Sequence, residues 1–134
     1  MTGSNIIIRL SIIGDIPSLK NVIRFGRNGQ VYHQNNCIIE YKTDFKYQTI
    51  QQLKKRPRWS KVVPFLAPVM VGLTIYQGNR RRDGHNQMST VFDALEYAGV
   101  IKNDRQIISW FGKTKLDRKN PRVEITVMEG QGGD

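Results

Sequence analysis

The chain has 134 residues, of which 39% are hydrophobic, and its 21 Lys and Arg against 11 Asp and Glu give a formal net charge of +10. This length suits one domain with one hydrophobic core, and the apolar fraction excludes an intrinsically disordered chain. So large an excess of cations is typical of a nucleic-acid-binding protein, because each neutralised phosphate releases counterions; a soluble protein that is merely basic is the alternative.

The first elements in chain order are a strand, a short hairpin and a long helix. Residues 6–13 are rich in β-branched side chains and stop at Gly14, which predicts the strand. Residues 22–25 and 30–33 flank an Asn-Gly turn, which predicts the hairpin. Residues 36–55 predict a helix that Pro57 ends. Its apolar side chains form two adjoining stripes, made of Ile38, Tyr41 and Phe45 and of Tyr47, Ile50 and Leu53.

The single cysteine, Cys37, excludes an internal disulfide and a cysteine-based zinc finger. Because it stands beside Ile38 and Ile39, we expect it to be a small buried hydrophobe. The apolar run at residues 6–13 is too short to span a bilayer, and no targeting signal is visible. We therefore expect a protein of the reducing cytoplasm, with no membrane partner.

A dense positive segment follows the long helix. It places five cations around Trp59 within eight residues, namely Lys54, Lys55, Arg56, Arg58 and Lys61. Basic residues do suit the C-terminal end of a helix, so a solvated helix end is one interpretation. The number of cations exceeds what capping needs, and we favour contact with phosphate.

The second half predicts a central strand over residues 68–76, a helix over 86–98 that stops at Gly99, and strands over 106–115 and 122–129 that pair as a hairpin. The second helix has an apolar face of Met88, Val91, Phe92 and Leu95, and a polar face of Asn86, Ser89 or Thr90, Asp93 and Tyr97. This order favours the α+β class, in which two main helices pack against one mixed β-sheet. We expect a single domain over residues 1–134, frayed at 1–4 and 130–134.

Two acids lie unexpectedly close to cations in this basic chain. Asp83 ends the run of Arg80, Arg81 and Arg82, and Asp104 follows the second helix. Carboxylates repel phosphate, so their presence is explained if Mg²⁺ or Mn²⁺ lies between the acids and DNA. His85 is a candidate third ligand or general base, with a plain loop histidine as the alternative.

The helix between the two acids constrains their distance. A helix of about 13 residues is roughly 20 Å long. Asp83 and Asp104 therefore meet only if the loop from Gly99 to Asn103 runs back along the helix, or if the site lies across a dimer interface.

The segment resembles the central motif of the RusA family. It reads Asp83-x-His85-Asn86-x-x-Ser89, then Asp93-Ala94-Leu95, Gly99 and Asn103-Asp104-x-Gln106. The family pattern is Asp-x-Asp-Asn-x-x-Lys, Asp-Ala-Leu, Gly and Asp-Asp-x-Gln at the same spacing. An early element, Pro17-Ser18-x-x-Asn21, is also similar to the family's start. The resemblance implies a small homodimeric endonuclease, often prophage-borne, that resolves Holliday junctions in recombination and repair with Mg²⁺ or Mn²⁺.

By this resemblance Asp83 and Asp104 are metal ligands, and Asn86, Asp93 and Asn103 stand at positions that support them. Three positions depart from the pattern: His85 replaces an acid, Ser89 a lysine and Asn103 an acid. Losing a carboxylate weakens binding of a hard cation, and losing the lysine removes a charge that can stabilise the transition state.

Three functions follow as hypotheses. The first is a dimeric, metal-dependent endonuclease that cuts branched DNA, of bacterial or phage origin. Its phosphate contacts would be made by Arg80, Arg81, Arg82, Lys54, Lys55, Arg56, Arg58, Lys61, Lys113 and Lys115. The second is a weakened or inactive branched-DNA-binding protein of the same fold. The third is a basic domain that associates with RNA or ribosomes.

Overall fold

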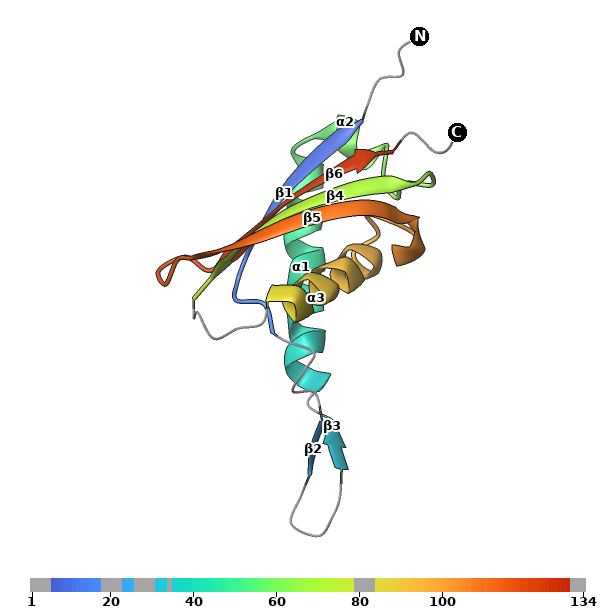
Figure 1. Cartoon of the computed structure of the whole chain (residues 1–134). Coiled ribbons are helices and arrows are strands. Elements are labelled where there is room, and N and C mark those ends of the chain that lie inside the picture. Colours follow the sequence, from blue (N-terminus) through green and yellow to red (C-terminus); the bar gives the residue numbers. More distant parts are fainter. Residues whose placement is uncertain (1–5, 18–22, 26–30, 34, 79–83, 131–134) are drawn as a thin grey trace.

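The computed structural model describes residues 6–17, 23–25, 31–33, 35–78 and 84–130. Its elements follow the predicted order (Figure 1). They are β1 (Ile7–Ile13), β2 (Ile23–Phe25), β3 (Val31–His33), α1 (Asn35–Lys54), α2 (Pro57–Ser60), β4 (Val69–Gln77), α3 (Gly84–Tyr97), the 3-10 helix η2 (Asp104–Gln106), β5 (Ile107–Leu116) and β6 (Arg122–Glu129). The α+β prediction, with a mixed sheet and two main helices, is confirmed.

Four of these strands form one sheet in the order β1-β6-β4-β5. β4 is an inner strand, as predicted. It pairs in parallel with β5, while β6 pairs antiparallel with both β4 and β1. The predicted β5–β6 hairpin is wrong. Because α3 carries the chain back to the start of β4, β5 adds parallel to β4 on one side, and β6 then inserts on the other.

Both main helices lie on the same face of this sheet (Figure 1). Alternate residues of β4 point into the core and are buried, which is the period-two pattern of a strand covered on one side. The core joins these residues to apolar side chains of the helices, including Phe45 on α1 and Val91 and Leu95 on α3. The β2–β3 hairpin pairs only with itself within the described residues and projects beyond the start of α1 (Figure 1).

Two burial predictions for α1 need correction, and one alternative on α3 is decided. Tyr47 is 62% exposed and Ile50 38%, because the inner stripe of α1 continues from Phe45 through Thr49 to Leu53. At 100° per residue, positions 47 and 50 lie about 200° and 140° around the helix from Phe45. Thr90 is fully buried on α3, leaving Ser89 on the polar face.

Cys37 is exposed rather than buried. It belongs to the first turn of α1, which extends past the region that the sheet covers (Figure 1). At the other end of the chain, Gly130 is buried, and its N–H donates to the Pro68 carbonyl. Residues 1–4 and 131–134 lie outside the described residues.

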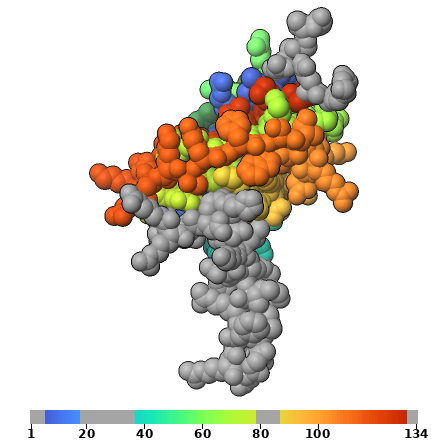
Figure 2. All heavy atoms as spheres, in the orientation of Figure 1, coloured from blue at the N-terminus to red at the C-terminus, as the bar shows by residue number. Residues whose placement is uncertain are grey.

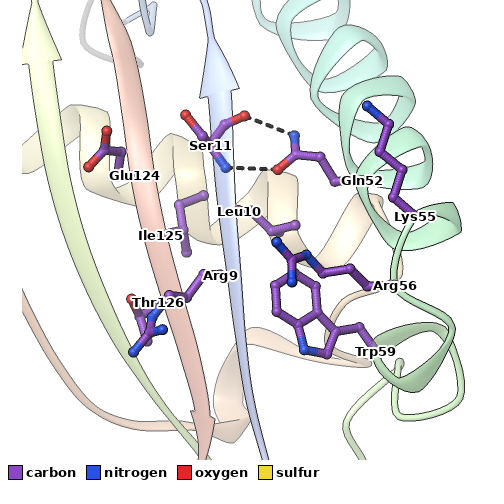
Figure 3. A pocket seen from close by; sticks show the side chains of 10 residues that line it. All are labelled: Arg9, Leu10, Ser11, Gln52, Lys55, Arg56, Trp59, Glu124, Ile125 and Thr126. Atoms are coloured by element: carbon purple, nitrogen blue, oxygen red, sulfur yellow. Dashed lines mark hydrogen bonds between the residues drawn. The ribbon is translucent and has the colours of Figure 1, made fainter.

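The two edges of the sheet differ. β5 forms one edge, and Figure 2 shows this strand, in orange, uncovered along the side that faces the viewer. β1 forms the other edge, and glutamine side chains from α1 cap it. The Gln52 amide accepts from Ser11 N–H (2.9 Å) and donates to its carbonyl (2.8 Å) (Figure 3). Gln48 binds Ile13 in the same way, at 2.8 and 2.9 Å. These side chains satisfy backbone groups that a further strand would need.

Candidate functional site

A buried hydrogen-bond network holds the start of α3 against the end of β4. Gln87 is fully buried; its Oε1 accepts from Gln77 Nε2 (2.6 Å), and its Nε2 donates to the Ile16 carbonyl (2.8 Å). One turn further along, Thr90 Oγ1 donates to the Pro17 carbonyl (3.2 Å). Gln87 was not predicted, although its place four residues before Val91 on the inner face was a signal that could have found it.

The first part of the predicted motif lies at this end of α3. His85 and Asn86 belong to its first turn, but their side chains fall outside the part of the chain that the structure describes. Arg80, Arg81, Arg82 and Asp83 lie outside the described residues altogether. Further along the helix, Ser89 is exposed and Asp93 half-buried.

The second part of the motif is a tightly bonded loop beyond the far end of α3. Asn103 caps η2, where its Oδ1 accepts from Arg105 N–H (2.9 Å). The Gln106 side chain accepts from the N–H groups of Lys102 and Asn103 and donates to the carbonyls of Phe65 and Ala67. Gln106 therefore fixes the loop that carries Asp104 to the segment before β4.

Asp104 is exposed, and its backbone N–H donates to Glu96 Oε1 (2.9 Å). Its carboxylate has no hydrogen bond or ion pair with the described residues, so it is available to a ligand. The bond to Glu96 also brings a second acid to this loop, which the sequence reasoning missed.

The two parts of the motif lie at opposite ends of α3. Glu96 is the residue before the last in this 14-residue helix, whereas Gly84 is the first. The loop after α3 does not run back along the helix, because Phe65 N–H donates to the Val100 carbonyl and Ile101 bridges to Phe65. A helix of this length spans about 21 Å, so the start of α3 and Asp104 are separated by roughly that distance within one subunit.

A comparison with protein families identifies the chain. The family described as "Endodeoxyribonuclease RusA" matches residues 17–128. The chain belongs to the RusA family. This match covers β2 to β6 and contains both parts of the motif. The RusA family comprises endonucleases that resolve DNA junctions, which is consistent with the charge of this chain. No curated protein matches the chain significantly.

Whether Asp83, His85 and Asp104 form a RusA metal site stays a prediction. Within the described residues no group of three His, Cys, Asp or Glu side chains is placed to hold a metal ion. The side chains of Asp83 and His85, two of the three predicted ligands, fall outside the part of the chain that the structure describes. The exposed Asp104 carboxylate fits a hard cation, because carboxylate oxygens are the usual ligands of Mg²⁺ and Mn²⁺.

The basic segment after α1 lines one side of a cleft at the β1 edge, opposite residues of β1 and β6 (Figure 3). The cleft has a volume of about 580 Å³, and Arg9, Lys55, Arg56 and Trp59 are among its lining residues. The Arg56 guanidinium lies 4.6 Å from the centre of the Trp59 ring. All the cations predicted to bind phosphate are exposed where the structure describes them: Lys54, Lys55, Arg56, Arg58, Lys61, Lys113 and Lys115. No described helix is long and apolar enough to cross a membrane.

Proposed function

We propose that this chain is a homodimeric, Mg²⁺- or Mn²⁺-dependent endonuclease that resolves Holliday junctions, with each active site shared between two subunits. One observation carries the shared site: the start of α3 and Asp104 lie at opposite ends of the same helix. Asp83 directly precedes α3 in sequence, so a second copy is the remaining way to bring the two acids together. The proposed setting is a bacterial cytoplasm, with a bacterial or phage gene.

The open edge of β5 supports a specific dimer. Ten residues long and carrying exposed Ile108 and Trp110, it is the kind of edge strand that pairs with another chain. Gln48 and Gln52 already cap the β1 edge. A two-fold axis through β5 would pair it antiparallel with its copy, making an isologous interface.

This pairing would bring the two halves of the motif together. Asp104 immediately precedes β5, whereas Leu116 at the end of β5 is aligned with Gln77 at the end of β4. In an antiparallel pair, the start of one β5 lies beside the end of the other. The loop of Asp104 would then lie beside the end of the partner subunit's β5. That is the end of the sheet at which α3 begins.

In this site the carboxylates of Asp83 and Asp104, with His85, would hold the cation. A bound Mg²⁺ or Mn²⁺ supplies Lewis acidity and a water of lowered pKa. Asn103 and Gln106 would position Asp104 by fixing its loop, and Asn86 and Asp93 would support the site from α3. The phosphates of the junction arms would be bound by Arg80, Arg81, Arg82 and the exposed lysines and arginines of residues 54–61, 113 and 115.

A branched-DNA-binding protein with weakened or absent catalysis is the second candidate. Two residues favour it: His85 stands where the RusA pattern has an acid, and Ser89 where it has a lysine. The first change removes a negative ligand, and the second removes a cation that can stabilise the charge of the transition state.

The test uses a labelled four-way junction with Mg²⁺ or Mn²⁺ and the variants Asp83→Asn and Asp104→Asn. We expect paired nicks from the wild type and none from either variant, with junction binding retained. Binding without nicks under either metal would support the second candidate instead. A gain of Mg²⁺-dependent cleavage in His85→Asp would assign the weakness to that position.

Mixing the two inactive variants tests the shared site. A heterodimer of Asp83→Asn and Asp104→Asn has one site with both acids intact if each site draws on two subunits. It has none if each site lies within one subunit. We expect the mixture to regain single-strand nicking. A mixture that exchanges subunits and stays inactive would refute the shared site.

A further inference from the structure

The face of the sheet opposite the helices carries aromatic and basic side chains in register. Alignment of β4 with β5 puts Phe111 beside Gly72, Lys113 beside Thr74 and Lys115 beside Tyr76. Gly72, Thr74 and Tyr76 alternate with the buried side chains of β4, so they lie on the face that the helices do not cover. Their partners on β5 share this face.

Phe111 is the most exposed aromatic side chain of this face, at 72%. Its ring lies over Gly72, where a Cβ atom would come within 2.7 Å of the ring. A glycine in an inner strand commonly marks a close approach of this kind. The far end of the ring therefore lies against the backbone of β4, and most of the side chain is open to a ligand.

The charge around Phe111 is positive. Lys113 and Lys115 are exposed on the same strand, and Arg9 is exposed on the same face of β1, across from Thr126. None of these three cations has an ion pair with the described residues. Arg122, which stacks 3.7 Å from the centre of the Tyr76 ring, is engaged by Asp117 and Glu124.

We propose that this open face binds single-stranded DNA, with a base stacked on the exposed ring of Phe111 and with Lys113, Lys115 and Arg9 at the phosphates. Stacking on an aromatic ring is sequence-tolerant, since every base offers a π-face. Bases of a duplex are stacked inside it and cannot reach such a ring, so the occupant is an unpaired segment. Open sheet faces with aromatic side chains bind single strands in this way in other folds.

This surface goes beyond the proposed endonuclease function, because it takes an unpaired strand, lies on the face opposite α3 and needs no metal. It shares Lys113 and Lys115 with the proposed contacts to the junction arms. A Phe111 that merely shields Gly72 is the competing explanation. That explanation predicts the same stability for any apolar cover and no role for the ring in binding DNA.

The test measures binding of a labelled 12-nucleotide oligo(dT) and of an abasic 12-mer of equal charge, in EDTA at fixed salt. The variants are Phe111→Leu, which keeps an apolar cover over Gly72, Phe111→Trp, which keeps an aromatic ring, and Lys113→Ala with Lys115→Ala. Tyr47→Ala, at an exposed aromatic of α1, is the matched control. Thermal unfolding and sedimentation of each variant check the fold and the oligomeric state.

We expect Phe111→Leu to weaken oligo(dT) binding about 5- to 150-fold, the range for one base stacked on an aromatic side chain. Abasic binding should be unchanged, and the double lysine variant should weaken both ligands. Phe111→Trp should bind oligo(dT) like the wild type, with its added indole emission quenched. Equal affinities of wild type and Phe111→Leu for oligo(dT), or equal losses for both ligands, would overturn the proposal.

Discussion

Replacing Gln87 by Met tests whether the buried network at the start of α3 stabilises the fold. Methionine has a similar length, so the change removes hydrogen bonds with little change in packing. The Ile16 carbonyl and the Gln77 amide each lose the partner that Gln87 supplies. A buried polar group left unsatisfied costs about 1–3 kcal/mol. Gln77 has a further interaction, so we expect about 2–4 kcal/mol for the two groups together.

Urea unfolding followed by circular dichroism measures this loss. For 134 residues and a typical entropy of unfolding per residue, it corresponds to a fall in Tm of roughly 7–14 °C. The urea midpoint should fall with an unchanged slope, because the surface exposed on unfolding is the same. Gln51→Met, the same substitution at a half-buried residue of α1, is the control and should shift the midpoint little.

A double-mutant cycle with Gln77→Met isolates the bond between the two glutamines. The double variant should lose less stability than the sum of the single variants, because both partners then become apolar. A wild-type midpoint in Gln87→Met, or strict additivity in the cycle, would refute the reasoning.

Three further predictions each concern one side chain. Tyr41→Phe should leave the free energy of unfolding unchanged or raise it by up to about 1 kcal/mol, because the Tyr41 hydroxyl is buried without a hydrogen-bond partner among the described residues. Thermal unfolding measures this, and a large loss would contradict it. The hydrogen bond from Arg122 lowers the pKa of Asp117 below its ordinary 3.8, so this carboxylate stabilises the fold above that pH, and the contribution is lost as the pH falls through the lowered value. Tm measured from pH 5 to pH 2 should therefore fall less in Asp117→Asn than in the wild type, and equal slopes would count against the ion pair. Gln106→Leu should lower stability by about 1–3 kcal/mol and reduce junction cleavage more than junction binding; equal losses of the two would exclude a positioning role.

The fold class could be predicted because periodicity reports which side of an element is buried. Alternating residues in β1, β4 and β6 indicate strands covered on one face. The pairing of β5 and β6 could not be predicted this way. Two strands joined by a turn look like a hairpin in sequence. In the structure β5 instead pairs in parallel with β4 along its whole length, and this long-range pairing leaves no local signal in the sequence.

The predicted site residues stay a prediction, and the side chains that fix their segments could not be predicted, since a motif gives residue types and spacing but not what holds them. Gln87 and Gln106 were missed as structural residues because a polar side chain is expected at the surface. Both instead satisfy backbone or amide groups that would otherwise be buried without partners. The predictions for Tyr47 and Ile50 were wrong in the opposite sense. These side chains are apolar, yet their angle around α1 directs them to solvent.

Gln87 and Gln106 also limit how the two parts of the motif can come together. Gln87 fixes the start of α3 to the segment after β1, and Gln106 fixes the Asp104 loop to the segment before β4. Each half of the motif is thus bonded to an opposite end of the same sheet, about 21 Å apart along α3. Loop motion within one subunit would have to break one of these networks to close that distance. In the proposed dimer, a second subunit paired through the open edge of β5 would close it with both networks intact.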